Sequence, residues 1–483
     1  MEETSPKSNL STYILTTLVA GFLGYLIIKQ VSLPPFFLIF AALTGGIYLL
    51  ARGMSKPEII TYALVAYLPF SKELAGGFSG LALAFNFTNL LMSFIMIVWF
   101  TGKFAEGEPL WINTPLNFPI FLFMFIGLIS VVRGSYLASG QWFFTLIEYK
   151  RWTTPIFMFF LVLNTVKDRH TIKNVVIIMM IVTTIVGLMA IYDYMDVGAN
   201  SSLDSSRIGG IADQPNMLAA FFNYYMFLPF GFFLMNANKF KYWLLNLSVL
   251  IQFRGIMVTF SRGGYLAFAF ALYAICFFKN KFLFMALIVL TWLIYINPVL
   301  LPAGIRYRMG QTLENKSTIV DSGGVKEADL DTSAQSRIEV WRGAINMIKE
   351  SPIFGVGYGL FPEMIKYYWS GGTEIDAHNT YLIIAAEMGI PALLVFLLIV
   401  LMTLGQTHSL YKTTQDPFAK ALALGFMGGI CGLLVSNLFG SRLDSQEVSS
   451  YFWILAALVM RLKILDKKEA ELEEVTKRLQ DVT

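Results

Sequence analysis

Apolar residues fill long stretches of this chain from end to end, and short polar segments separate them. A helix needs about 20 apolar residues to cross a membrane, and by that measure we mark about fourteen candidate spans. They lie near residues 12–28, 33–51, 57–70, 86–101, 115–132, 152–166, 174–192, 214–235, 242–260, 261–278, 281–300, 379–407, 417–438 and 449–463. Because several are short, we predict about 12–14 transmembrane helices, which makes the chain an all-α integral membrane protein.

The longest polar segment, residues 301–378, interrupts this pattern before the last three spans. Within it, Ile338, Trp341, Ile345 and Ile348 recur at three- and four-residue steps. That spacing places side chains on one face of a helix. We therefore predict an amphipathic helix that lies on the membrane surface.

This amphipathic helix should end at Ser351-Pro352, because a proline disfavours the helical conformation in the residue before it. A glycine-containing turn and a second short amphipathic run, residues 361–369, follow. His378-Asn379 then opens a long apolar helix. The polar segment is thus expected to form one large loop of amphipathic helices that re-enters the membrane.

Composition supports the membrane assignment. Of the 483 residues, 56% are apolar and 14% are charged, whereas charged residues make up about 25% of an ordinary soluble protein. Since the apolar stretches cover the whole chain, we interpret 1–483 as a single polytopic membrane domain. The formal charge of +4, without a basic patch among aromatic residues, gives no argument for a nucleic-acid partner.

The distribution of lysine and arginine predicts the orientation. These residues are somewhat more frequent in the loops on the N-terminal side than in the opposite loops, which include one with Lys150 and Arg151. By the positive-inside rule, both termini are then cytoplasmic, including a charged helical tail at 464–483. The large loop at 301–378 is predicted to be periplasmic.

Few chemistries find support in the residue types. Both cysteines lie in apolar stretches, and no closely spaced group of Cys, His and Asp suggests a metal site. There is no phosphate-binding glycine loop after a strand and no GxSxG motif. We therefore expect neither a metal nor a cofactor.

Two arginines in glycine-rich surroundings lie next to predicted spans on the outer side. Arg207 precedes Gly209-Gly210 and a helix start at Pro215-Asn216, and Arg262 stands between a serine and two glycines. Guanidinium groups stay charged and bind phosphate in a forked geometry, so this pair suits a lipid-linked diphosphate. Either arginine can equally extend to the membrane interface or pair with a carboxylate.

His378 lies where the large loop meets the start of a helix, whereas His170 and His408 lie on the inner side. The positive end of a helix favours an uncharged imidazole, and this form acts as a general base. Asp376 is a candidate to orient the ring. A purely structural histidine explains the sequence alone equally well.

The polar loop also carries an ordered motif, R-x-x-x-W-x-x-A-x-x-x-I-x-x-x-P-x-x-G-x-G, followed by His-Asn and Glu-Met-Gly-Ile. Its residues are Arg337, Trp341, Ala344, Ile348, Pro352, Gly355, Gly357, His378-Asn379 and 387–390. Arg207 with Gly210, Pro215-Asn216 and Ser261-Arg262-Gly263 precede it. In this order, over residues 200–400, the motifs resemble those of the O-antigen ligase and polymerase superfamily.

The resemblance implies a metal-independent glycosyltransferase with a membrane-embedded fold of the C type (GT-C). Its donor would be a glycan on undecaprenyl diphosphate, used at the periplasmic face of the bacterial inner membrane, with membrane lipid around the protein. His378 matches the family's essential loop histidine and would be the general base. Arg207 and Arg262 match arginines assigned to the diphosphate, and Arg337 is a further candidate for that contact. A single displacement would invert the anomeric centre.

Several alternatives remain open. The acceptor would be a lipid A core sugar for a ligase, a second lipid-linked glycan for a polymerase, or a protein hydroxyl for a protein O-oligosaccharyltransferase. We favour the first two, since no additional soluble domain suggests a protein acceptor. A lipid or polysaccharide flippase would have a similar number of spans, but with polar residues near the bilayer midplane on broken helices. A scaffold for envelope assembly would tolerate the loss of His378.

Overall fold

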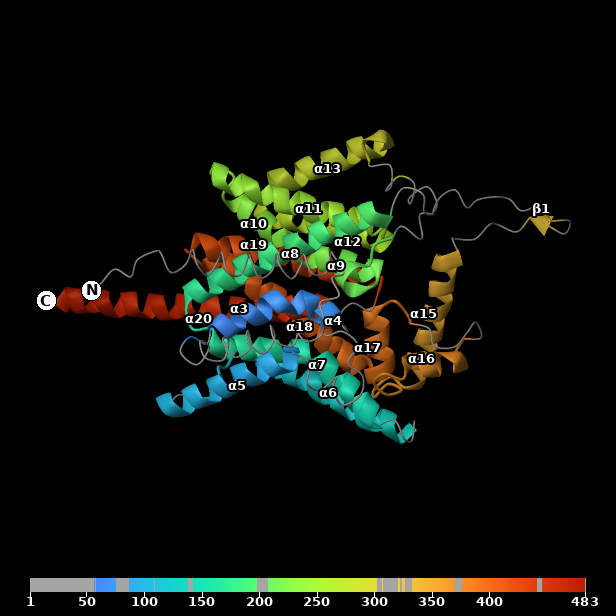
Figure 1. Ribbon diagram of the computed structural model, residues 1–483, viewed down its shortest axis with the longest axis horizontal. Coiled ribbons are helices and arrows are strands. Elements are labelled where there is room, and N and C mark those ends of the chain that lie inside the picture. Colours follow the sequence, from blue (N-terminus) through green and yellow to red (C-terminus); the bar gives the residue numbers. More distant parts are fainter. Residues whose placement is uncertain are drawn as a thin grey trace, which may run out of the picture.

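The computed structural model describes residues 56, 58–74, 87–107, 109–137, 142–197, 207–301, 306, 320–321, 324–325, 332–369, 376–440 and 445–482. Regular structure in these residues is helical (Figure 1), apart from a short antiparallel hairpin of β1 (Val320–Asp321) and β2 (Gly324–Val325). The prediction of an all-α integral membrane protein is confirmed.

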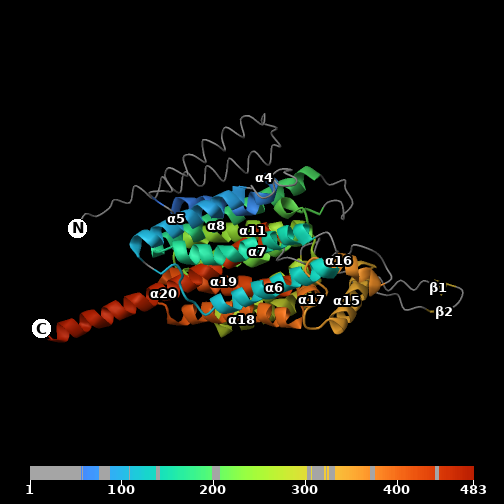
Figure 2. The ribbon, with the colours of Figure 1, turned by 90° about the horizontal axis from the view of Figure 1, so that it is seen from below.

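Most helices of the bundle run along the long axis of the molecule (Figures 1 and 2). In chain order they are α3 (Glu58–Tyr67), α5 (Phe87–Glu106), α6 (Asn117–Leu137), α7 (Trp142–Thr165), α8 (Arg169–Val197), α9 (Pro215–Tyr225), α10 (Phe227–Met235), α11 (Leu244–Val258), α12 (Arg262–Lys279), α13 (Lys281–Ile296), α17 (Thr380–Met388), α18 (Ile390–Thr413), α19 (Pro417–Ser436) and α20 (Gln446–Val482). Short helices η1 (Leu68–Phe70), α4 (Ser71–Leu74), η3 (Gly210–Ala212), η4 (Phe240–Trp243) and η5 (Pro298–Leu300) connect them.

The membrane character of the bundle follows from helix length and composition. Seven helical segments among the described residues are long and apolar enough to cross a membrane, and two shorter apolar helices accompany them. The predicted spans at 12–28 and 33–51 lie outside the described residues, so the total number of spans stays a prediction.

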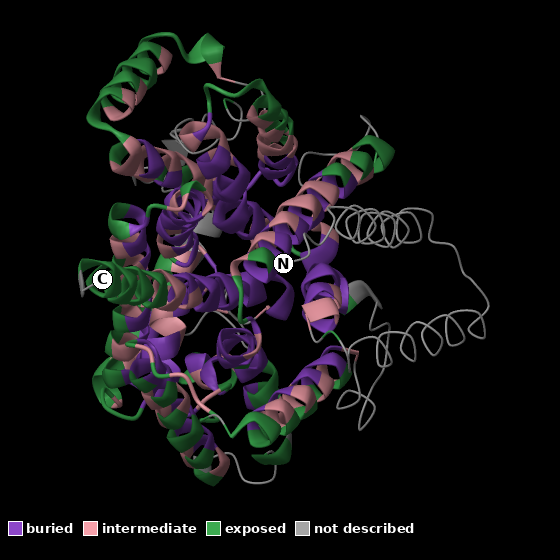
Figure 3. Ribbon diagram, turned by 90° about the vertical axis from the view of Figure 1, so that its left-hand side faces the viewer, coloured by how far each residue is buried: buried purple, intermediate pink, exposed green. Residues whose placement is uncertain are grey.

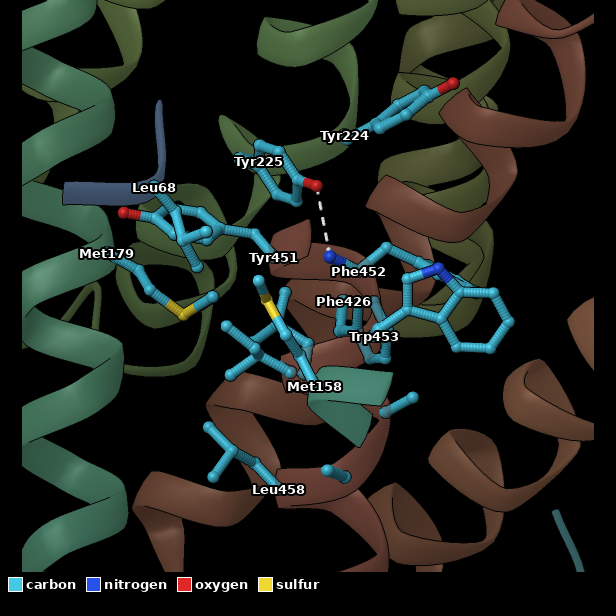
Figure 4. Packing of buried hydrophobic residues seen from close by; sticks show 14 of the residues in the cluster. Leu68, Met158, Met179, Tyr224, Tyr225, Phe426, Tyr451, Phe452, Trp453 and Leu458 are labelled. Carbon is cyan, nitrogen blue, oxygen red and sulfur yellow. Dashed lines mark hydrogen bonds between the residues drawn. The ribbon is translucent and has the colours of Figure 1, made fainter. Parts of the chain in front are cut away.

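Buried aromatic and aliphatic side chains fill the interior, and exposed residues lie at the periphery (Figure 3). Two buried tyrosines connect the C-terminal helix to the bundle (Figure 4). The Tyr225 hydroxyl donates to the carbonyl of Val448 and accepts from the Phe452 amide at 3.1 Å, while the Tyr451 hydroxyl donates to the Val65 carbonyl at 2.6 Å. Buried phenols need such partners, so these bonds orient α20 against α9 and α3.

At one end of the bundle, α20 protrudes as a continuous helix (Figures 1 and 2). There Arg169, at the start of α8, forms ion pairs with Asp416 at 3.1 Å, with Glu469 at 2.7 Å, and with Asp466. One guanidinium thus joins the beginnings of α8 and α19 to the protruding part of α20.

At the opposite end, α15 (Thr332–Glu350), α16 (Phe361–Met364) and η6 (Ile365–Tyr367) form a helical cap. Helix α15 runs across the direction of the bundle helices (Figure 1). It ends immediately before Ser351-Pro352, as predicted. These loop helices bury a small core of their own against α17.

Helix α15 has a buried face that the sequence analysis did not identify, and its placement on the membrane surface stays a prediction. Val340, Ala344 and Met347 form its buried face, whereas Ile338 and Ile345 are exposed. Helix α15 packs against α17 and η6 within the helical cap. These contacts, and not the spacing of the isoleucines, determine which side of α15 is buried.

The prediction of one long apolar helix that opens at His378-Asn379 is wrong, because this stretch forms two helices, α17 and α18, with a break at Gly389. This glycine has φ +88° and ψ 167°, a combination that is essentially restricted to glycine. The next amide, of Ile390, donates to the Pro352 carbonyl at 2.8 Å, and the Val356 amide donates to the Ala386 carbonyl at 2.8 Å. The glycine turn after Pro352 therefore packs into the break between the two helices.

A third difference concerns the predicted loop with Lys150 and Arg151. Helix α7 begins at Trp142, so both cations are helical rather than in a loop. The helix begins with the apolar run WFFTLI, and the charged residues Glu148, Lys150 and Arg151 that follow interrupt the apolar stretch, so a hydropathy criterion places the boundary after them.

Candidate functional site

Arg207 lies in the segment that leads into α9. Its Nε donates to the carbonyl of Thr259 at 3.1 Å, and one terminal nitrogen donates to Oδ1 of Asn216 at 3.2 Å. The Ile208 amide also donates to the Val258 carbonyl, at 3.3 Å. These contacts orient the guanidinium between the end of α11 and the start of α9.

Asn216 connects this arginine to the start of α12. Its Oδ1 also accepts a hydrogen bond from the Ser261 hydroxyl at 2.7 Å. Ser261 in turn caps α12, because its side-chain oxygen accepts from the Gly264 amide at 3.2 Å. Arg262 is the first residue of α12 and directly follows Ser261, the residue that contacts Asn216.

The segment after α19 joins α12 to α17. Gly263 approaches this segment so closely that a Cβ on it would lie 2.6 Å from the Cβ of Phe439. The next residue, Gly440, accepts a hydrogen bond through its carbonyl from the Thr380 hydroxyl at 2.9 Å. The same hydroxyl is 2.7 Å from Oδ1 of Asn437. The start of α17 and the start of α12 thus share neighbours.

His378 immediately precedes the N-cap of α17. The cap residue, Asn379, accepts from the Tyr381 and Leu382 amides. His378 itself has φ +48°, and histidine is one of the few residues other than glycine that adopt this left-handed conformation readily. His378 therefore forms the turn at which the chain leaves the helical cap, one residue before the N-cap residue Asn379 of α17.

Asp376 contacts His378 twice. Its Oδ1 accepts from the His378 amide at 3.0 Å, and its Oδ2 lies 3.2 Å from the ring Nδ1. A proton on Nδ1 satisfies this contact and leaves Nε2 with a free lone pair. Both side chains remain partly open to solvent, with exposed fractions of 42% and 39%.

Arg337 lies on α15, one helical turn before Trp341. The Trp341 indole donates to the carbonyl of Ala377 at 2.7 Å, and Ala377 is the residue before His378. Helix α15 is thereby attached to the histidine turn, and Arg337 belongs to the helix that packs beside it.

The predicted site residues are consequently connected through neighbouring contacts. Arg207 is linked by Asn216 to the cap of α12, where Arg262 lies; α12 contacts the 437–440 segment; and that segment binds Thr380, two residues after His378. Helices α15 and α17, which flank His378 in the chain, lie at the end of the bundle opposite the protruding part of α20 (Figures 1 and 2).

Tyr368, in the helical cap, is another titratable group near this end. Burial raises the pKa of its phenol to about 12, and the hydrogen bond and charge of Glu350 act in the same direction. The hydroxyl therefore stays protonated at neutral pH, and Tyr368 does not serve as a base there.

The sequence did not identify the 437–440 segment as part of this region, because its residues are small or neutral and form no motif. Glu387, in the Glu-Met-Gly-Ile motif, connects several helices, which the sequence analysis did not predict. Its Oε1 accepts from the Phe361 amide at 3.0 Å, and its carbonyl accepts from the Ser130 hydroxyl at 2.8 Å. Glu387 thus joins α6, α16 and α17.

In the part of the chain that the structure describes, no group of three or more His, Cys, Asp or Glu side chains lies close enough to hold a metal ion.

Part of the chain that contains these residues also matches a known protein family. A family model described as O-antigen ligase matches residues 247–397, which extend from α11 through the helical cap to α18. No curated protein matches the sequence. The matched region includes Arg262, Arg337 and His378, and the helices around it are those of a multi-pass membrane protein. Over residues 247–397, about a third of the chain, the protein is therefore similar to the O-antigen ligase family.

Proposed function

We propose that this protein transfers a glycan from undecaprenyl diphosphate to an acceptor hydroxyl at the periplasmic face of the bacterial inner membrane, as an O-antigen ligase or polymerase. Arg207 and Arg262, with Arg337 as a further candidate, bind the diphosphate. His378 is the general base, and Asp376 positions it.

The observation that supports this proposal is the continuous set of contacts from Arg207 to His378. Asn216 and Ser261 connect the two arginines, and the 437–440 segment connects the start of α12 to the start of α17. A diphosphate needs permanent cations and a nearby base for the incoming hydroxyl, and this end of the bundle contains both residue types.

The chemical step is a single displacement. The acceptor oxygen forms a bond to the anomeric carbon while its proton passes to Nε2 of His378. The bond between that carbon and the diphosphate oxygen breaks, and its electron pair leaves with undecaprenyl diphosphate. Guanidinium groups placed at the diphosphate stabilise the negative charge that develops on the leaving group. Attack from the opposite face inverts the anomeric centre.

The direct test is transfer by the purified protein in lipid nanodiscs. The donor is a glycan on undecaprenyl diphosphate, and the acceptors are lipid A core, a second donor molecule and an acceptor protein, each in a separate reaction. Mass spectrometry of the products identifies the acceptor, and NMR of the new linkage reports its anomeric configuration. Absence of product with all three acceptors, under conditions where the protein binds the donor, would refute the proposed function.

The arginines predict a specific kinetic change. Arg207→Ala or Arg262→Ala should raise the donor KM about tenfold or more, because each removes a charge-assisted contact worth roughly 1.5–3 kcal/mol. Titration of the lipid-linked donor measures this change. Arg254→Ala is the matched control: Arg254 is exposed and lies over the Tyr194 ring at 5.3 Å, so the donor KM should stay the same. An unchanged KM in both site variants would refute the diphosphate assignment.

Asp376 is a positioning residue, and its loss should change the rate rather than donor binding. Asp376→Asn keeps the acceptor for the His378 amide but removes the carboxylate at Nδ1, so we expect kcat to fall about tenfold. The donor KM should not change. Asp196→Asn, an exposed aspartate at the end of α8, is the control. A rise in KM without a fall in kcat would contradict the positioning role.

A further inference from the structure

A cavity of about 230 Å³ lies beside the Arg207 segment and has no role in the steps above. Ala212, Gln214 and Met217, which flank Asn216, form one wall. A single buried water needs only about 10–15 Å³ of such volume. The cavity is therefore large enough for a ligand of several polar groups.

The charged side chains of the cavity balance one another. Lys72 and Arg151 are its cations, and Glu148 and Glu447 are its carboxylates. Lys72 also forms an ion pair with Asp213 at 2.9 Å, and Arg151 lies 3.8 Å from Glu148. An anionic ligand alone would meet both carboxylates, and a cationic ligand alone would meet both cations. A ligand without net charge avoids either repulsion.

The hydrogen-bonding groups of the cavity specify this ligand further. Lys72 and Arg151 only donate hydrogen bonds, the two carboxylates only accept, and Gln214 does both. Hydroxyl groups donate and accept at the same atom, so a polyhydroxylated molecule can satisfy every member of this set. The set fits the hydroxyls of a sugar ring.

Two aromatic rings complete the cavity. Trp152 and Tyr358 both line it, and their ring centroids lie 5.6 Å apart. Tyr358 follows the glycine turn that packs into the break between α17 and α18, and its amide donates to the Ser130 carbonyl. Rigid aromatic rings offer an apolar face to the carbon skeleton of a ligand while the charged groups bind its oxygens.

The rim and the floor of the cavity differ in accessibility. The side chains of Glu148 and Arg151 are more than half exposed. Glu447 is buried, and its oxygens accept from the Ser71 hydroxyl at 3.1 Å and the Ser445 hydroxyl at 2.7 Å. Glu148 is therefore a residue that a ligand can reach and that can be replaced without disturbing the interior.

We propose that this cavity is a saccharide subsite that holds the donor sugars next to the diphosphate. The saccharide class follows from the lining alone. Its assignment to the donor rests on the proposed function, because the cavity shares the Ala212–Met217 wall with the Arg207 contact to Asn216. A sugar joined to the diphosphate must lie beside whatever binds the phosphates.

Binding to the full-length protein in nanodiscs, with two separate probes, tests this proposal. The first probe is the lipid-free glycan that mild acid releases from the lipid-linked donor used in the transfer assay. The second probe is undecaprenyl diphosphate without sugar. Glu148→Gln should weaken binding of the free glycan about tenfold, because it removes a charged hydrogen-bond acceptor. The same variant should bind undecaprenyl diphosphate as the unaltered protein does. Glu363→Gln, an exposed glutamate of α16, is the control that should change neither.

The outcomes separate this proposal from the proposed function. Unchanged glycan binding in Glu148→Gln, no binding of free glycan to the unaltered protein at any soluble concentration, or weaker binding of the sugar-free lipid diphosphate would each overturn the subsite. A larger effect on the acceptor KM than on the donor KM in the transfer assay would overturn the assignment to the donor. Failure of Arg207→Ala to weaken sugar-free lipid binding refutes only the diphosphate site.

Discussion

Replacing His378 by asparagine is expected to lower the rate of glycan transfer about 100-fold or more, which is the usual contribution of a positioned general base. Asparagine is the informative choice because it tolerates the left-handed conformation, φ +48°, that this position requires. The turn before α17 should therefore persist, while the amide side chain cannot accept the proton of the acceptor hydroxyl. The rate of product formation at saturating donor measures the change.

His408→Asn is the matched control for this experiment. His408 lies in α18 near the end of the bundle where α20 protrudes, with its ring 5.8 Å from that of Phe278. Its replacement should leave transfer unchanged. Size-exclusion chromatography and donor binding establish that both variants are folded. Full transfer activity in His378→Asn would exclude the general-base role, whatever the control shows.

Gly389→Ala is expected to have the largest effect on stability, a loss of about 3 kcal/mol or more from backbone strain and steric overlap together. A Cβ at this position would lie 2.1 Å from the Ile353 carbonyl oxygen, and φ +88° is unfavourable for any other residue. The glycine turn after Pro352 would have to move out of the break between α17 and α18. Thermal unfolding in detergent, followed by the loss of the monodisperse chromatographic peak, measures the loss.

Two further glycines separate the causes of this effect. Gly405, in the same helix α18, has no atom within 4 Å of an added Cβ, so Gly405→Ala should be neutral or stabilising by up to about 1 kcal/mol. Gly359 has φ +77° but open space around it, so Gly359→Ala should cost only the backbone strain, about 1 kcal/mol. A Gly389→Ala variant as stable as Gly405→Ala would show that the break between the helices does not need this glycine.

Much of the helical architecture could be predicted from the sequence because membrane helices carry a strong one-dimensional signal. The span predicted at 417–438 corresponds closely to α19, and the predicted end of the amphipathic helix at Ser351-Pro352 coincides with the end of α15. Apolar length and proline chemistry act locally, so they can be recognised without a structure.

The helix break at Gly389 could not be predicted from apolar length. Residues 379–407 are mostly apolar, and the one local sign of the break is Gly389 followed by Pro391, a pair that commonly marks the end of a helix. The break exists because residues 352–357, far away along the chain, supply hydrogen-bonding partners to the ends of α17 and α18. The buried face of α15 could not be predicted for the same reason, since it depends on the packing of α17 and η6.

By itself, then, the sequence determined the class of the protein, the approximate position of its membrane helices, and the residue types that suit a lipid diphosphate and a base. Apolar length, capping residues and permanent charge are properties of short segments, and they are readable in order. Only the tertiary structure decided which of these residues are neighbours. Contacts such as Arg207 with Thr259, Gly263 with Phe439, and Thr380 with Gly440 join segments that are distant in the chain, and these depend on how the helices pack.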